Sequence, residues 1–89
     1  MVFVKYGKHT IEVRLGSHGE EDIFYDGEVV SSKISGGRKS AHSFSVKEDG
    51  EDVIYDVKLG IKGLFSPIPG RLRPKIDVFR NGKKIYSSE

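Results

Sequence analysis

Cysteine is missing from the 89-residue sequence, and its absence removes several kinds of chemistry. Without cysteine the chain has no disulfide framework, no thiolate metal site and no cysteine nucleophile. A chain without disulfides suits a reducing compartment, so we expect a cytoplasmic protein. Long apolar stretches are missing too, because the longest run without a charged residue covers only residues 63–70. We therefore expect neither a signal peptide nor a membrane-spanning segment.

The length and the composition predict one small folded domain over residues 1–89. Hydrophobic residues make up 36% of the chain and charged residues 31%, which is typical of a globular protein. A domain of this size buries only about 60–65% of the surface that its unfolded chain exposes. Such a core is too small for a second domain or a deep cofactor cavity, and we expect no cofactor.

Apolar and polar residues alternate in two segments, as in half-buried strands. The segments are residues 10–15 and residues 53–59, and no part of the sequence shows helical spacing over three turns. Turn residues flank such runs, and dipeptides like Asp-Gly and Asn-Gly favour two-residue hairpins. The predicted turns are Asp26-Gly27, Asn81-Gly82, Gly7-Lys8 and a slightly longer loop at residues 48–51. The sequence therefore predicts an all-β domain.

Two parts of the sequence match each other in chemical class, position by position. Residues 12–16 (Glu-Val-Arg-Leu-Gly) match residues 56–60 (Asp-Val-Lys-Leu-Gly), and residues 22–27 match residues 77–82. In addition, serines fall opposite each other and phenylalanines lie in comparable leading strands. These further pairs are Ser32 with Ser87 and Phe3 with Phe44.

The matches predict two four-strand repeats joined by a short linker. The first repeat covers about residues 2–35, the linker residues 36–40, and the second repeat about residues 41–88. One such unit has a face that it cannot bury alone, so two copies are expected to pack face to face. We predict a small antiparallel β-sandwich of about eight strands, with a small, partly open barrel as the alternative.

The connection between the second and third strands differs between the two repeats. It is short and acidic at residues 16–21, but long, basic and apolar from Gly60 through Pro74. Loops of that length in compact domains are often functional. Its apolar residues either close one end of the sandwich or stay exposed inside a cationic rim, which would suit a protein with an acidic patch. The predicted partner-binding residues are Lys62, Leu64, Phe65, Ile68, Arg71, Arg73 and Lys75.

Positive charge is concentrated toward the C-terminus. Residues 1–60 carry 8 Lys and Arg against 11 Asp and Glu, whereas residues 61–89 carry 7 against 2. In the linker, Arg38 and Lys39 follow two glycines and are a second candidate for anion binding. Binding of nucleic acid or of an anionic membrane surface through the basic C-terminal third is therefore the alternative to a protein partner.

Sequence motifs for catalysis and for metal binding are missing. His9, His18 and His42 have no spacing that resembles a metal site, and there is no Gly-x-Ser-x-Gly nucleophile motif. Any Ser-His-Asp combination would need residues from scattered positions. We expect a protein that is not an enzyme and that holds no metal.

Segments of opposite charge also predict an association between copies of the chain. The acidic residues 20–22 of one molecule could meet residues 71–73 (Arg-Leu-Arg) of another, head to tail. The expected state is a monomer or a weak homo-oligomer.

One part of the sequence resembles a known family. His9-Thr10-Ile11-Glu12, a glycine-containing loop and then residues 23–30 (Ile-Phe-Tyr-Asp-Gly-Glu-Val-Val) are similar to Fas apoptotic inhibitory molecule, over about 30 residues. The resemblance implies an all-β sandwich with Asp-Gly hairpins and a protein without a catalytic site.

Overall fold

The alternating segments of the sequence form strands. The computed structural model of the chain describes residues 2–34, 39–62 and 73–88, and within these ranges every regular element is a β-strand. The strands are β1 (Val2–Tyr6), β2 (His9–Leu15), β3 (Glu20–Tyr25), β4 (Glu28–Ile34), β5 (Ser40–Glu48), β6 (Glu51–Lys62), β7 (Arg73–Arg80) and β8 (Lys83–Ser87).

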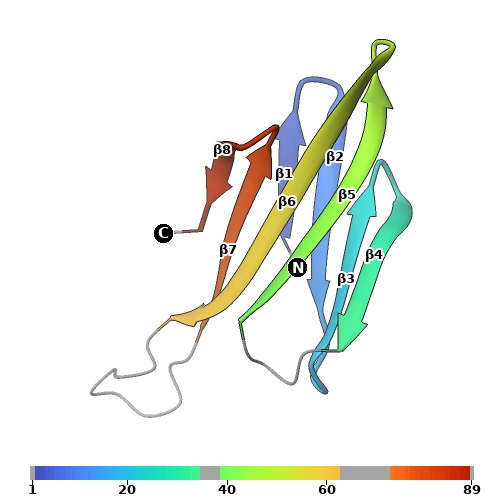
Figure 1. Cartoon of the computed structure of the whole chain (residues 1–89). Coiled ribbons are helices and arrows are strands. Elements are labelled where there is room, and N and C mark those ends of the chain that lie inside the picture. Colours follow the sequence, from blue (N-terminus) through green and yellow to red (C-terminus); the bar gives the residue numbers. More distant parts are fainter. Residues whose placement is uncertain (1, 35–38, 63–72, 89) are drawn as a thin grey trace.

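Each half of the chain folds into an antiparallel meander. Sheet A has the strand order β1-β2-β3-β4 and sheet B the order β5-β6-β7-β8, with four strands in each. The two sheets lie as two layers, and β5 and β6 of sheet B cross over the strands of sheet A (Figure 1). The predicted eight-strand sandwich of two repeats is confirmed. The barrel alternative is wrong, because no strand of sheet A pairs with a strand of sheet B in the described ranges.

Two-residue turns join β1 to β2, β3 to β4, β5 to β6 and β7 to β8. Asp26 and Gly27 have φ values of 49° and 88°, and Asn81 and Gly82 have values of 49° and 83°, which is the left-handed pattern of a type I′ turn. The β5–β6 turn is the same type, since its two central residues also have positive φ. The prediction of a longer loop at residues 48–51 is wrong, because the strand ladder continues to a Glu48–Glu51 pair and leaves only two residues outside it.

The two sheets repeat the same local geometry. Asp22 pairs with Ser32, and Asp77 pairs with Ser87 in the same way. A β-bulge follows in each sheet, between Ile23 and Phe24 and between Val78 and Phe79. In the β3–β4 and β7–β8 turns, the side chain of the first turn residue accepts a hydrogen bond from the backbone of a neighbouring strand. Asp26 Oδ1 accepts the Thr10 N–H at 2.8 Å, and Asn81 Oδ1 accepts the Ile54 N–H at 2.9 Å.

One detail of the predicted match needs correction. Phe3 and Phe44 lie in equivalent strands, but their side chains have opposite orientations. Val4 pairs with Ile11, and Phe44 pairs with the equivalent Tyr55, so Phe44 corresponds to Val4. Phe3 is therefore 58% exposed on the outer face of sheet A, while Phe44 is 8% exposed in the core.

The inward-facing residues of both sheets form one core. Each side chain of this size contributes about 1.5–3 kcal/mol on burial. Sheet A supplies Val4, Ile11, Val13 and Ile23, and sheet B supplies Phe44, Val53, Tyr55, Val57, Leu59, Ile76 and Val78.

The long connection of the second repeat is shorter than predicted. Strands β6 and β7 continue to pair through Gly60–Lys75, Ile61–Pro74 and Lys62–Arg73. Pro74 fits this ladder because a proline near the start of a strand costs little pairing. Residues 60–62 and 73–74 are therefore strand residues rather than loop residues, and residues 63–72 lie outside the described part of the chain.

Candidate anion-binding surface on the second sheet

Most of the predicted partner-binding residues lie outside what the structure describes. This holds for Leu64, Phe65, Ile68 and Arg71, and for Arg38 of the linker. Lys62 and Arg73 are paired strand residues whose side chains are not described. Lys75 and Lys39 are described, and the fold brings these two residues, predicted for separate sites, to the same place.

A hollow of about 150 Å³ lies on sheet B beside the ends of β6 and β7. It is lined by Lys39, Lys58, Leu59, Gly60, Lys75 and Asp77. The strand ladder explains this grouping. Lys58 pairs with Asp77 and Gly60 with Lys75, and these residues alternate with buried ones, so they share the outer face of the sheet. We call Lys39, Lys58, Gly60, Lys75 and Asp77 the basic corner.

Gly60 lines this hollow, and because it has no side chain it leaves the space open. A Cβ atom at position 60 would lie 3.9 Å from Lys39 Cγ, an ordinary contact distance. A methyl group would therefore fit, whereas a longer side chain would occupy the hollow itself.

Positive charge exceeds negative charge in the basic corner. Lys75 Nζ lies 3.8 Å from Asp77 Oδ2, and Lys58 Nζ lies 5.0 Å from the centre of the Phe79 ring. Asp77 Oδ1 is out of contact with solvent and accepts no hydrogen bond from the described residues. Three lysines against one aspartate leave a net charge of two, which suits an anionic oxygen ligand.

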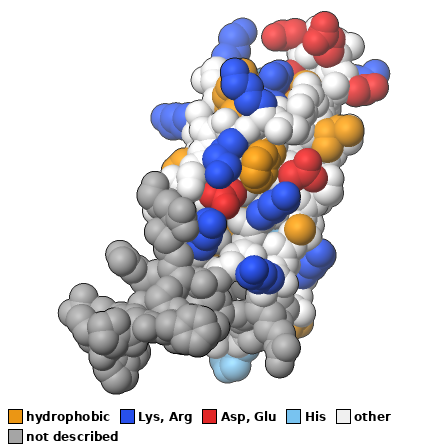
Figure 2. All heavy atoms as spheres, turned by 60° about the vertical axis from the view of Figure 1, so that its left-hand side comes forward, with side chains coloured by type: hydrophobic (Ala, Val, Ile, Leu, Met, Phe, Trp, Pro, Cys, Tyr) orange, Lys and Arg blue, Asp and Glu red, His pale blue; other side chains and the backbone are white. Residues whose placement is uncertain are grey.

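The surface around the corner is mixed in charge. Figure 2 shows Lys and Arg side chains spread over the middle of this side of the molecule, with single acidic side chains among them. Acidic side chains gather at the far end, where the β5–β6 turn carries the exposed residues Asp49, Glu51 and Asp52.

Sheet A has an equivalent corner of opposite charge. Arg14 pairs with Asp22 as Lys58 pairs with Asp77, and Gly16 and Glu20 occupy the places of Gly60 and Lys75. The Glu20 carboxylate lies against Gly16, where any Cβ would collide with it. Arg14 lies 4.4 Å from the centre of the Phe24 ring, as Lys58 lies over Phe79. We call Arg14, Gly16, Glu20 and Asp22 the acidic corner.

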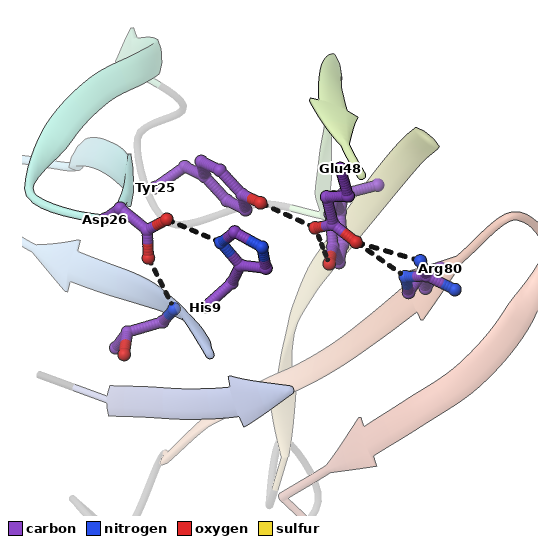
Figure 3. Close-up of polar contacts among 7 residues, drawn as sticks. His9, Tyr25, Asp26, Glu48 and Arg80 are labelled. Atoms are coloured by element: carbon purple, nitrogen blue, oxygen red, sulfur yellow. Dashed lines mark hydrogen bonds and ion pairs between the residues drawn. The ribbon is translucent and has the colours of Figure 1, made fainter. Parts of the chain in front are cut away.

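A buried charged group that was not among the predicted site residues lies between the sheets. Glu48 is 6% exposed, and its Oε2 accepts hydrogen bonds from the Tyr25 and Tyr55 hydroxyls, both at 2.6 Å. Its Oε1 accepts two from Arg80, at 2.8 and 3.2 Å. In Figure 3, Tyr25 and Arg80 point at Glu48 from opposite sides, and His9 lies over the Tyr25 ring with a bond to Asp26. Tyr25 belongs to sheet A, so this network ties the two layers together.

The network shifts the ionisation of its members. Burial by itself would raise the pKa of Glu48, but the hydrogen bonds from Tyr25, Tyr55 and Arg80 outweigh it and lower the pKa to about 2. Burial and then the Glu48 carboxylate raise the pKa of Tyr55 to about 12, and the same causes raise the pKa of Tyr25. Glu48 is therefore ionised at neutral pH and acts as a fully bonded acceptor.

A second buried network joins the sheets through His42. His42 Nε2 lies 2.9 Å from Glu21 Oε1, and His42 Nδ1 lies 2.6 Å from Ser31 Oγ. The fold thus assembles a Ser-His-Glu set that the sequence left scattered. However, the His42 side chain is 0% exposed, and Ser40 donates a further hydrogen bond to Glu21 at 2.7 Å. This arrangement satisfies buried polar groups across the interface.

A sequence signal for both networks existed. His42 and Glu48 fall in the same alternating phase as the inward-facing Phe44 and Val46. A polar residue in the apolar phase of a strand predicts a buried polar contact, but its partners come from other strands.

Residues 2–34, 39–62 and 73–88 contain no group of three or more His, Asp and Glu that could hold a metal ion. These ranges hold no helix that could cross a membrane.

No family model, curated protein or solved structure matches the chain. The similarity to Fas apoptotic inhibitory molecule stays a prediction.

Proposed function

We propose that this domain is a non-enzymatic module that binds an acidic surface of another protein. The contact is formed by the basic corner of sheet B and the adjoining 61–74 segment. The observation that carries the proposal is the convergence of Lys39, Lys58 and Lys75 around one hollow, from strand and linker positions that are distant in sequence. In such a contact the lysines steer and pair with carboxylates, while the apolar residues of the segment supply buried area.

The mixed charge of the surface favours protein over nucleic acid or anionic lipid. Asp77 lies inside the basic corner, and Asp56 lies two residues before Lys58 on the same face. A row of phosphates would be repelled by these carboxylates, whereas a protein partner can place a cation opposite them. Nucleic acid or anionic lipid binding by the same surface remains the alternative, and it requires a steep loss of affinity with salt.

The buried networks support a role in binding rather than in catalysis. Both carboxylate oxygens of Glu48 accept hydrogen bonds, and the side chain of His42 is 0% exposed. A general base or nucleophile must reach a substrate atom within hydrogen-bond distance. These groups instead stabilise the contact between the sheets.

The test compares two double variants in binding to three probes. Lys58→Glu/Lys75→Glu reverses the basic corner, and Lys5→Glu/Lys8→Glu makes the same charge change on exposed lysines of the first hairpin. The probes are a glutamate-rich peptide, a single-stranded oligonucleotide and a phosphatidylserine vesicle, and the readout is amide chemical shifts. We expect the peptide to shift Lys39, Lys58 and Gly60 in the wild type and in the Lys5/Lys8 variant.

In the Lys58/Lys75 variant those shifts should vanish while the thermal unfolding midpoint stays within a few degrees. Equal peptide binding by all three proteins would refute the proposal. Binding of the oligonucleotide or the vesicle alone, lost steeply as salt rises, would establish the alternative.

The 61–74 segment has its own test. Arg71→Glu/Arg73→Glu should weaken peptide binding and leave thermal unfolding unchanged. Phe65→Ala should act in the same direction if the apolar residues contact the partner. Unchanged binding in both variants would restrict the site to the basic corner.

A further inference from the structure

The acidic and basic corners have the same strand geometry and opposite charge. Both lie on the outer face of a second and third strand, and both contain a glycine under a long side chain. The decisive difference is at one position, where sheet A has Glu20 and sheet B has Lys75. As a result Arg14, Glu20 and Asp22 leave one net negative charge, and Lys58, Lys75 and Asp77 leave one net positive charge, to which Lys39 adds another.

The face that carries the acidic corner also exposes apolar side chains. Phe3 and Val29 are each 58% exposed and Ile34 is 79% exposed. The register places Phe3 and Val29 in one row across sheet A, through Glu12 and Phe24. The equivalent row of sheet B runs from Ser43 through Asp56 and Phe79 to Lys84. Sheet A therefore presents an acidic corner beside several exposed apolar side chains, whereas the outer face of sheet B is mainly polar and basic and exposes Ile54, at 51%, among its large apolar residues.

We infer that the acidic partner of the basic corner is a second copy of this chain, which docks through its acidic corner. The inference rests on the proposed function, because it uses the same surface and names its occupant. Glu20 and Asp22 of one copy lie against Lys58 and Lys75 of the next. Charge complementarity selects this pairing, since each corner repels its own kind. The exposed apolar row of sheet A is then covered by the lysine stems and the Phe79 ring of the neighbour.

This pairing is heterologous. The two corners lie on the outer faces of different sheets, so a copy bound through its acidic corner still offers its basic corner. Association of that type continues head to tail instead of closing at a dimer.

The structure revises the pairing that the sequence predicts. Glu21 cannot take part, because it is 5% exposed and bonded to His42 and Ser40 in the interior. Glu20 and Asp22 alternate with Glu21 and share the outer face. Of residues 71–73, Arg71 and Leu72 lie outside the described part of the chain, and the described basic partners are Lys58 and Lys75.

Sedimentation of four proteins tests the inference. The average mass of the wild type should rise with concentration and fall with added salt. Glu20→Lys makes both corners basic, and Lys58→Glu/Lys75→Glu makes both acidic, so each of these proteins alone should associate at least about tenfold more weakly. Because a mixture of the two restores opposite corners, the equimolar mixture should associate again. The triple variant Glu20→Lys/Lys58→Glu/Lys75→Glu, whose two corners have exchanged charges, should associate by itself.

The outcomes separate this inference from the proposed function. Glu20→Lys keeps the basic corner intact and should still bind the glutamate-rich peptide. A wild type that stays monomeric at every concentration would overturn the inference, as would Glu20→Lys and Lys58→Glu/Lys75→Glu proteins that each associate as the wild type does. Peptide binding would still stand in that case. A control pair, Lys5→Glu and Glu28→Lys, changes charge outside both corners and should leave association unchanged.

Discussion

Sheets A and B are built on one strand plan, but sheet B extends it at both ends. The first hairpin of sheet A ends at Tyr6–His9, while that of sheet B continues two pairs beyond the equivalent Val46–Val53. The β6–β7 ladder likewise extends past Gly60, whereas the β2–β3 ladder stops at Leu15–Glu21.

These extensions decide which residues are buried. Leu15 is 37% exposed at the end of the short ladder, and its counterpart Leu59 is 6% exposed beside the long one. The added pairs of the β5–β6 hairpin carry Glu48, so the buried charge exists only because that hairpin is longer. The longer ladders thus give the second repeat the Glu48 hydrogen-bond network and the basic corner without any change in strand topology.

The largest expected effect comes from removing the charge on the longer hairpin. Glu48→Ala leaves the Arg80 guanidinium and two tyrosine hydroxyls without their acceptor, and it should lower the free energy of unfolding by about 3–5 kcal/mol. Lys8→Ala, a change in the corresponding turn region of sheet A, should cost less than about 0.5 kcal/mol because Lys8 is exposed. Urea unfolding measures both. A small loss for Glu48→Ala would mean that the network does not hold the sheets together.

The same carboxylate predicts a dependence on pH. Its folded-state pKa of about 2 lies below the ordinary value of 4.5, so its stabilisation is fully present above pH 4.5 and is lost as pH falls toward 2. The stability difference between wild type and Glu48→Gln should be about 3 kcal/mol at pH 7 and should shrink steadily below pH 4.5. Urea unfolding at several pH values gives this difference, which other carboxylates do not affect. A difference independent of pH between 7 and 2 would contradict the assignment.

The turn glycines test how equal the two sheets are. Gly27 and Gly82 have φ values of 88° and 83°, and a Cβ at either would meet no atom within 4 Å. Alanine at each position should therefore cost about 1 kcal/mol through backbone strain alone. Thermal or urea unfolding of the two single variants should give values that agree within about 0.5 kcal/mol. A clear inequality would show that the turns are not equivalent.

The smallest effect on stability is expected from converting the outer face of sheet A to that of sheet B. Phe3→Ser and Val29→Lys introduce the residues found at the equivalent positions, and both sites are more than half exposed. Stability should change by less than about 1 kcal/mol. Self-association measured by sedimentation should weaken, because the apolar row is lost. Unchanged self-association would remove the apolar face from the contact.

Several features were predictable from local patterns. Alternation predicted inward-facing side chains at positions 11, 13, 15, 53, 55, 57 and 59, and all of them are buried except Leu15, which is 37% exposed. The Asp-Gly and Asn-Gly dipeptides predicted two-residue turns because left-handed φ values favour those residues. Phe44 was matched to Phe3, although it corresponds to Val4. Alternation alone does not show which residues of two strands are equivalent until the register with the next strand is known.

The candidate site was predictable only in part. Lys39 and Lys75 were identified as basic residues in separate segments, but Lys58 was not, because its charge is balanced by nearby Asp56 in the sequence. Their common location depends on the β5–β6–β7 ladder. The partners of Glu48 and His42 come from strands of both sheets, and no local pattern contains that information.

The sequence by itself determined the strands, the turns and the existence of two repeats, because backbone periodicity and turn conformation depend on residues within a few positions of each other. The tertiary structure decided which side chains meet. Strand pairing placed Lys58 and Lys75 around Gly60 on one face, and the packing of the two layers enclosed Glu48 and His42 between them. These contacts join residues far apart in the chain, so their geometry follows from register and from the stacking of the sheets.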